Sequence, residues 1–378
     1  MVRPLMKRPV LLLLSALATA SHAAEPGTTS ANFLKLGIGP RAVAMGEAQV
    51  GLADDVYAAY WNPAGLTQLQ NREAGFVQTQ YLQDIQSQYA AYAHPHPTLG
   101  TFAGSFTYLN VGKFDAFDAS GQPNGQVGAN DAALAFSYAL PVIRHRRMDS
   151  QLSIGVTGKY IQETLDSVTS HACAADLGLF YSPGKDFGGT LEGFKAGLAV
   201  RNLGSSMKFD QESFTLPRTI AAGVSWTGIW LGEKLTAAVD GEQPNDGKET
   251  VGAGLELSTL QLLILRVGYT SKGDAGTGLR LGAGLRFKTV QVDYAFAGAG
   301  DLGQTHRIGL TFRFGTTPKD PLVLAQDWYQ QGMREYRRTH YSEALIDFNK
   351  ALEIDPSHPE ALTMMKKTYE NLKAITPQ

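Results

Sequence analysis

Apolar and polar residues alternate along most of the chain between residues 70 and 316. In residues 306–314, even positions hold apolar side chains and one histidine, whereas odd positions hold arginine, glycine and threonine. A period of two is that of a β-strand whose two faces meet different surroundings. We expect about fourteen such strands, close to residues 73–82, 86–95, 100–111, 130–141, 150–162, 172–182, 193–203, 217–227, 233–242, 248–258, 260–270, 277–288, 289–297 and 304–315.

These strands could form a soluble sandwich or a transmembrane barrel. Most segments run about 9–12 residues, the length that a tilted strand needs to cross a bilayer, whereas sandwich strands are usually shorter. Aromatic residues cluster near the segment ends, as they do at membrane interfaces. An alternating arginine on the lipid side would cost about 2–4 kcal/mol at the membrane centre, so the polar face should line the lumen. We therefore predict an all-β transmembrane barrel of antiparallel strands over residues 72–315.

The start of the chain predicts export. Residues 1–24 combine Arg3, Lys7 and Arg8 with a short apolar run and an Ala-rich end, which is the pattern of a secretory signal peptide. No apolar run of 18 residues follows, which argues against a helical membrane protein. We expect the bacterial outer membrane, with both termini periplasmic because an even number of strands returns the chain to its starting side.

Residues 25–71 lack the period of a strand and precede the first one. A barrel of about fourteen strands is too wide for its own side chains to fill, so this segment is expected to fold into the lumen as a plug. Its rings should fill the lumen, and its acids should pair with lumenal arginines. The plug and lumen contacts that we expect are Arg41, Asp54, Asp55, Trp61, Asn62, Pro63, Arg280, Arg286, Arg307 and Arg313.

Several blocks carry a family resemblance. "FLKLGIGPRAVAMGEA" followed by "ADDVYAAYWNPAGL", and later "RNLG", "LPRTI" and "DLGQTHRIGLTFRF", resemble the PorV/PorQ family over roughly residues 30 to 315. That family is similar to the FadL long-chain fatty-acid transporters, and the resemblance implies a fourteen-stranded outer-membrane barrel with an N-terminal plug. One departure is Glu47, where the family more often has glycine.

The C-terminal residues follow a helical period. Residues 316–323 form a turn-rich linker, and residues 324–378 fit one tetratricopeptide repeat and a further helix. Small residues would let the first two helices cross closely, and a proline would end the second. The packing positions are Trp328, Gly332, Tyr336, Tyr341, Ala344, Phe348, Ala351 and Pro356.

The sequence offers no convincing catalytic or metal site. His94 and His96 fall where a strand should end, and two glycine-rich stretches that imitate dinucleotide fingerprints do not open a helix after a strand. The lone cysteine, Cys173, shares the apolar face of its strand. The basic and acidic residues, 33 and 35, are nearly balanced, which gives no indication of nucleic-acid binding. We expect no enzyme activity and no cofactor.

Two functions remain open. The resemblance implies an accessory role in type IX-like protein secretion, with secretion machinery or cargo bound through the helical tail and the barrel mouths. The alternative is a FadL-like conduit for a hydrophobic small molecule. In both cases the barrel contacts outer-membrane lipid.

Overall fold

The computed structural model describes residues 27–118, 120–145, 150–183, 193–260, 262–272, 276–316 and 321–375. The expected signal peptide, residues 1–24, lies outside these residues. Among them, no helix is long and apolar enough to cross a membrane.

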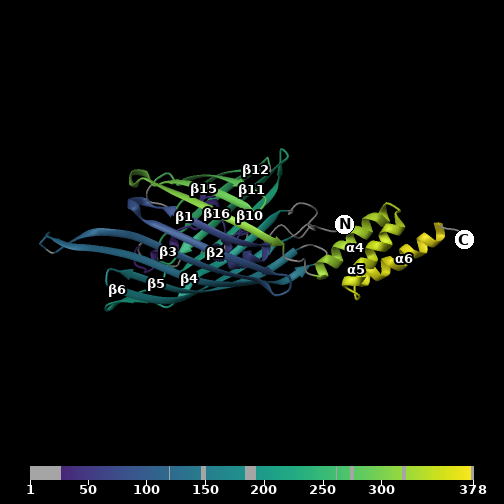
Figure 1. Ribbon diagram of the computed structural model, residues 1–378, viewed down its shortest axis with the longest axis horizontal. Helices are drawn as coiled ribbons and strands as arrows, with labels where there is room; N and C mark the ends of the chain where they lie inside the picture. The colour runs from purple at the N-terminus through teal and green to yellow at the C-terminus, as the bar shows by residue number, and fades with distance from the viewer. Residues whose placement is uncertain are drawn as a thin grey trace, which may run out of the picture.

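Fourteen antiparallel strands form a closed barrel (Figure 1). Each barrel strand pairs with the barrel strands that come before and after it in the chain, with β7 beside β10. Strand β1 closes the barrel against β16, where Asn71 lies opposite Thr316. The predicted fold class is confirmed. The barrel strands are β1 (Asn71–Gln80), β2 (Gln86–His96), β3 (Gly100–Phe117), β4 (Pro123–His145), β5 (Ser150–Leu165), β6 (Val168–Ser182), β7 (Phe194–Gly204), β10 (Thr219–Trp230), β11 (Glu233–Pro244), β12 (Thr250–Thr259), β13 (Leu263–Thr270), β14 (Leu279–Arg286), β15 (Val290–Gly298) and β16 (Gln304–Thr316).

The faces of the strands follow the alternation. On β5, the outward side chains of Ile154 and Val156 are 42% and 44% exposed, whereas the inward side chain of Thr157 is fully buried. This arrangement places apolar side chains toward lipid and polar ones inside, where they can be hydrogen-bonded.

Two features at one end of the barrel were not expected. Strands β3 and β4 were predicted to end and restart near residues 111 and 130, but they stay paired through Phe114 and Val127. This β3–β4 ribbon, residues 112–128, extends beyond the other strands (Figure 1). Past the membrane, a strand no longer needs lipid-facing and lumenal sides, so its alternation weakens. The second feature is a short hairpin of β8 (Met207–Phe209) and β9 (Glu212–Phe214).

The N-terminal segment packs against the inner side of the barrel wall. It contains η1 (Asn32–Lys35), α2 (Pro40–Ala44), α3 (Ala58–Trp61) and η2 (Pro63–Gln68), and most of its residues are buried. Helix α2 packs on β13 to β16, and η2 packs on β3 to β6. The plug therefore touches opposite parts of the wall.

Glycines in the wall allow this close contact. A Cβ added to Gly155 would lie 2.3 Å from the backbone nitrogen of Ala64, and one added to Gly254 would lie 2.4 Å from the carbonyl oxygen of Met45. Atoms that close would clash, so a side chain at these positions would push the plug away. The wall glycines that meet plug atoms in this way are Gly75, Gly155, Gly178, Gly197, Gly223, Gly252, Gly254, Gly268, Gly282 and Gly309.

The two ends of the described chain lie at opposite mouths of the barrel. Asn71 and Thr316 mark one end, which we call the Asn71 mouth. The backbone nitrogen of Ser30 bonds the carbonyl oxygen of Thr215, and that of Ala31 bonds Glu163, both at the other end, which we call the far mouth. The strand ends share one side as expected, but the described N-terminal residues do not, because the plug crosses the lumen before β1 begins.

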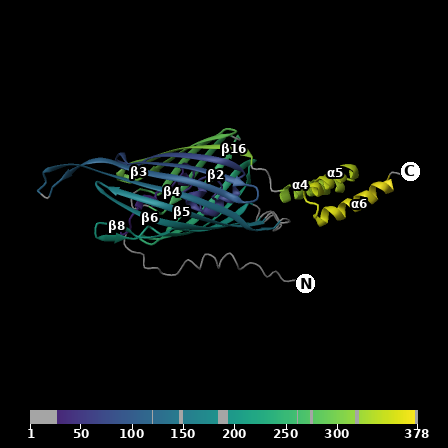
Figure 2. The ribbon, with the colours of Figure 1, turned by 60° about the horizontal axis from the view of Figure 1, so that its bottom comes forward.

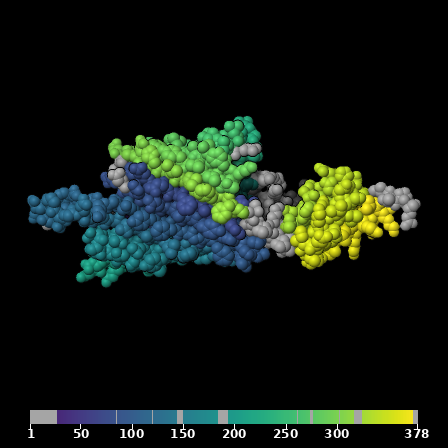
Figure 3. All heavy atoms as spheres, in the orientation of Figure 1, coloured from purple at the N-terminus to yellow at the C-terminus, as the bar shows by residue number. Residues whose placement is uncertain are grey.

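The C-terminal residues form three helices, α4 (Pro321–Arg337), α5 (Tyr341–Ile354) and α6 (Pro359–Ile375). They lie beyond the Asn71 mouth, whereas β8 lies at the far mouth (Figure 2). In the space-filling view the helices form a separate lobe (Figure 3). Helix α4 begins inside the expected linker, because Pro321 suits the first position of a helix.

The expected packing positions meet between α4 and α5. Gly332 allows the approach, since its Cβ would lie 2.7 Å from the Phe348 ring, and Ala344, Phe348 and Ala351 are buried. The Tyr336 and Tyr341 ring centroids are 5.4 Å apart, and the Lys350 ammonium lies 4.1 Å from the centre of the Trp328 ring. Pro356 follows the end of α5.

A matched pair of substitutions on β5 tests the glycine contacts. Gly155→Ala should push η2 away from the wall. We expect the barrel to unfold at a lower temperature when samples are heated before gel electrophoresis, and to show a higher conductance in planar bilayers. Gly158→Ala should change neither, because Gly158 is exposed and no atom lies within 4 Å of the place that its Cβ would take. Equal behaviour of the two variants would show that the plug does not rest on this glycine.

Candidate functional site

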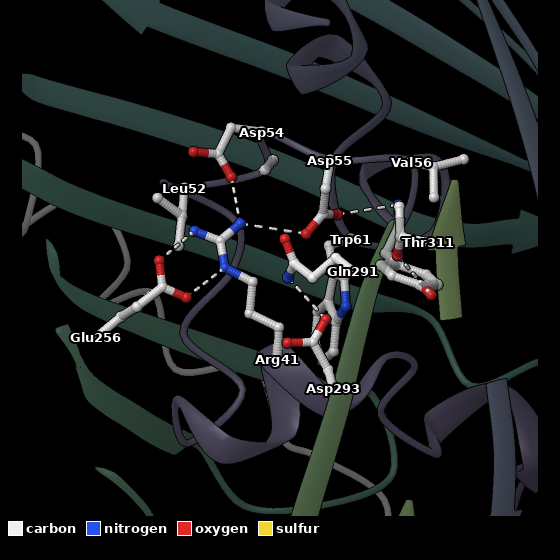
Figure 4. A network of polar contacts seen from close by, with 12 residues as sticks. Arg41, Leu52, Asp54, Asp55, Val56, Trp61, Glu256, Gln291, Asp293 and Thr311 are labelled. Atoms are coloured by element: carbon white, nitrogen blue, oxygen red, sulfur yellow. Dashed lines mark hydrogen bonds and ion pairs between the residues drawn. The ribbon is translucent and has the colours of Figure 1, made fainter. Parts of the chain in front are cut away.

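The guanidinium of Arg41 is at the centre of a polar network that joins the plug to the wall (Figure 4). Pro40 starts α2 and Arg41 follows it, so the short helix aims this side chain into the lumen. Its Nε and Nη2 donate to the two carboxylate oxygens of Glu256 on β12 at 2.7 and 2.9 Å, a two-pronged contact that fixes orientation as well as distance. Its Nη1 donates to Asp54, and to Asp55 at 3.2 Å.

The contacts continue around the wall and return to the plug. Arg266 on β13 donates to Glu256 and to Asp293 on β15, each at 2.7 Å. Gln291 joins Asp293 to Arg286 and Arg313. Because these side chains come from β12, β13, β14, β15 and β16, the network ties a large part of the wall to one plug residue.

The return contact goes through Glu73 on β1. Arg313 donates to one oxygen of Glu73 at 2.8 Å, and the other oxygen accepts from the backbone nitrogen of Val56 at 3.1 Å. The network thus holds the plug at two separate points, Arg41 and Val56.

The two adjacent plug acids differ in their electrostatics. Burial acts to raise the pKa of Asp54, but Arg41 and Lys195, whose ammonium lies 3.7 Å away, hold that pKa well below its usual value. Burial also raises the pKa of Asp55, and there Arg41 does not reverse the effect because the charge of Asp54 adds to it. Burial alone would lower the pKa of Arg41, but the surrounding carboxylates outweigh this effect and raise that pKa above its usual value, so the guanidinium stays charged.

We expected the plug acids Asp54 and Asp55 to pair with arginines of the wall, and this prediction is wrong. Asp54 and Asp55 pair with Arg41 of the plug itself, and the wall contributes Lys195. In the described part of the chain, none of the four expected wall arginines bonds to Asp54 or Asp55; Arg286 and Arg313 bond Gln291, and Arg313 reaches the plug only through Glu73.

The other two wall arginines lie too far along the barrel axis. Arg307 donates to Thr305 and to the Tyr81 hydroxyl, and Arg280 makes long contacts of 3.4 Å to the carbonyl oxygens of Leu279 and Gly298. Both arginines sit near the far mouth. Alternation gives the face of a strand, but it does not give the height of a residue relative to the plug.

The expected ring and turn residues lie inside the plug, and Asn62 also contacts the wall. The Trp61 side chain is fully buried and its Nε1 donates to the carbonyl oxygen of Ile38 at 2.9 Å. The amide nitrogen of Asn62 donates to the carbonyl oxygens of Val50 and of Leu179 on β6, both at 3.1 Å. Pro63 then starts η2.

Some contributors were not among the expected site residues. Arg201 on β7 lies 5.2 Å from the Trp61 ring centre and donates to Glu242 at 2.5 Å. Asp240 accepts from the backbone nitrogen of Val50. Their lumenal faces were visible in the alternation, and the cost of burying an unpaired charge implied partners, but nothing in the sequence named those partners.

The described residues hold no group of three or more His, Cys, Asp or Glu side chains that could bind a metal. Cys173 is exposed on the outer face of β6. His94 and His96 lie near the end of β2 and bond their neighbours Tyr92 and Thr98.

Removing the central cation should release the plug. Arg41→Gln leaves Glu256, Asp54 and Asp55 without their shared partner, and breaking a buried ion pair in this way costs about 3–5 kcal/mol. We expect a lower urea midpoint and a higher conductance in planar bilayers. Arg218→Gln, which changes an exposed arginine, is the control. Wild-type conductance for Arg41→Gln would contradict the role of Arg41 as the anchor.

The acids should respond differently. At pH 7, Asp54→Asn should cost more stability than Asp55→Asn. Because the pKa of Asp54 is lower in the folded protein than in the unfolded chain, its charge stabilises the fold at every pH above the unfolded pKa. This stabilisation is lost only as the pH falls through the folded-state pKa. The raised pKa of Asp55 means that its proton is favoured in the fold, so its charge is a burden that disappears at acidic pH. Urea midpoints at pH 7 and 4 test the order. Replacing both acids with alanine should raise conductance.

Known proteins resemble this chain in sequence and in fold. A UPF0164 protein of Treponema pallidum (strain Nichols) is 23% identical, over 95% of this chain and 89% of that protein. The CymD monoaromatic hydrocarbon channel matches with a TM-score of 0.49 and 12% identity, over 75% of this chain and 98% of that one. The toluene transporter TodX of Pseudomonas putida matches with a TM-score of 0.48 and 10% identity, over 73% and 96%.

A family model described as type IX secretion system protein PorV matches residues 20–238, which include the whole plug and the wall through the first half of β11. The match covers more than half of the 378 residues. The outer-membrane barrel described above therefore belongs to the PorV family.

Proposed function

We propose that this chain is a non-enzymatic accessory protein of type IX-like secretion, which binds exported proteins or secretion components at its surfaces and does not conduct them. The observation that carries the proposal is a plug fixed by buried ion pairs and by backbone contact with the wall, in a member of the PorV family.

The fit of the plug supports a closed lumen. Between Gly46 and Glu47 of the plug and the facing wall on β11, β12 and β13, the free space is about 10 Å³, roughly room for one water molecule. At this contact the plug leaves no room for a partner. We therefore place partners at the outer surface and at the mouths, of which the far mouth has a cavity of about 290 Å³.

The loops support an orientation. Turns at the Asn71 mouth include the short segments 97–99, 231–232 and 287–289, whereas the far mouth carries the β3–β4 ribbon and the β8–β9 hairpin. Outer-membrane barrels have short periplasmic turns and longer external loops. The Asn71 mouth and the helical tail would therefore face the periplasm, and residues 27–35 would lie at the cell surface.

The tail would be a tetratricopeptide-like docking module in the periplasm. The crossing of α4 and α5 at Gly332 and the buried Ala344, Phe348 and Ala351 support this assignment, and α6 would cover the second helix. A single repeat buries little surface, and such modules gain stability from neighbours, so the tail would gain from a protein partner.

A conduit for hydrophobic small molecules is the second candidate. One observation favours it, an apolar cluster on the inner faces of β3 to β6 that includes Leu109 and Ile161. The chain's own Phe33, Leu34 and Met207 already occupy this cluster, and the central lumen is charged. The accessory role therefore has the stronger support.

Chemical crosslinking in native outer membrane tests the accessory role. The intact protein and a version that ends at Gly315 would be recovered and their partners identified. We expect exported proteins or secretion components with the intact protein, and a changed set without the tail. Recovery of hydrophobic small molecules alone, with no protein partner from either version, would favour the conduit.

A substitution in the tail separates its role from that of the barrel. Gly332→Val would push against Phe348, and such overpacking costs about 1–3 kcal/mol. We expect weaker helical structure and loss of the tail-dependent partners, with unchanged barrel stability. Gln331→Val, at an exposed neighbouring position, is the control. If Gly332→Val keeps every partner, the folded tail is not the docking element.

A further inference from the structure

Residues 29–35, which we call the cap, lie across the far mouth and are held differently from the rest of the plug. The backbone nitrogens of Ser30 and Ala31 donate to the carbonyl oxygen of Thr215 at 3.0 Å and to Glu163 at 2.8 Å. The hydroxyl of Thr29 and the ammonium of Lys35 donate to the same oxygen of Asp246 at 2.5 and 2.7 Å.

Two adjacent side chains of the cap enter an apolar pocket. Phe33 and Leu34 are buried against the inner faces of β3 to β6 and against the β8–β9 hairpin and the loop that follows it. The pocket side chains are Leu109, Ala133, Ile161, Ala172, Ala174, Met207 and Leu216.

These contacts are those by which proteins recognise peptides. Main-chain donors meet a carbonyl and a carboxylate, two side chains fill a pocket, and a basic group meets an acid. A hydrocarbon could fill the pocket, but it would leave the buried Asp246 without the donors that the cap supplies. An unpaired buried acceptor is costly, so the site favours a peptide.

The wall anchors of the cap are separate from those of the plug. They lie at the far mouth, whereas the plug is held deeper by Arg41 and Asn62. The cap's direct link to the deeper plug is the hydrogen bond that the Tyr60 hydroxyl donates to the carbonyl oxygen of Leu34, so displacing the cap would break this contact and leave those of Arg41 and Asn62. Ala31 has φ 51°, a left-handed conformation that is strained for alanine. The β8–β9 hairpin pairs only three residues from each strand, and so small a hairpin has little stability of its own.

We propose that the cap is an internal occupant of a peptide-binding site, which an extended segment of an exported polypeptide takes by displacing it. That segment would carry a small polar residue, two adjacent apolar residues and a basic residue in the order of the cap. The identity of the partner as an exported polypeptide rests on the proposed secretion role.

Fluorescence anisotropy with a labelled peptide of residues 29–36, Thr-Ser-Ala-Asn-Phe-Leu-Lys-Leu, tests the site on the purified full-length protein. The double substitution Phe33→Ala, Leu34→Ala loosens the cap but leaves the pocket intact. Opening a site that the cap occupies more than nine-tenths of the time should tighten peptide binding by about tenfold or more. Adding Asp246→Asn should weaken binding again.

Three controls limit the result. Phe114→Ala with Phe117→Ala removes exposed aromatic residues of the β3–β4 ribbon and should bind as the wild type does. A peptide with alanine in place of phenylalanine and its adjacent leucine should bind neither protein, and detergent micelles alone should not bind the labelled peptide. Should the double variant fail to fold, Lys35→Ala loosens a single anchor and should give a smaller gain.

The proposal is overturned if the folded, opened variant does not bind the peptide, if Asp246→Asn leaves binding unchanged, or if only a hydrophobic dye such as N-phenyl-1-naphthylamine binds. Failure here, with exported proteins still recovered by crosslinking, would reject the cap site alone. Peptide binding without any recovered partner would leave a real site and reject the secretion role.

Discussion

The plug of this barrel is held where buried charges of opposite sign meet. The side chain of Arg41 is buried, and its three carboxylate partners come from the plug and from the wall. Separating plug and wall would take Arg41 away from Glu256 and the backbone nitrogen of Val56 away from Glu73, and losing a partner is expensive for a buried charge. The position of the plug, the closure of the lumen and the conformation of β12 to β16 near their inner faces all depend on this group of charges.

The glycine content follows from the same fit. The chain has 41 glycines, and many of those in the wall face plug backbone at distances that exclude a Cβ. Charge pairs and glycines play complementary parts: the glycines let two backbones touch, and the ion pairs fix where they touch. Glu47 stands at a position where the family more often has glycine. It adopts φ 67°, a conformation that favours glycine, and a 3.0 Å ion pair to Lys272 holds its side chain there.

The alternation of residues predicted the strand number and the faces, because the contrast between lipid and lumen acts on each residue separately. Ile154 points outward and Lys159 inward for that reason. Heights along the axis depend on strand register and on the path of the plug, which no single segment encodes. Arg307 therefore appeared as a partner of the plug acids although it lies near the far mouth. The direction of residues 27–70 was also out of reach, because that segment has no period.

The crossing of the lumen by the N-terminal segment constrains the order of assembly. The segment enters at one mouth and joins β1 at the other, and β1 pairs with β16, whose residues are the last of the barrel to be synthesised. When β1 pairs with β16, the barrel closes around the N-terminal segment. This segment must therefore lie inside before β1 and β16 pair, or its N-terminal end must be threaded through the closed barrel afterwards. Closure between strands so distant in sequence is slow, which gives the segment time to settle while the wall is still an open sheet.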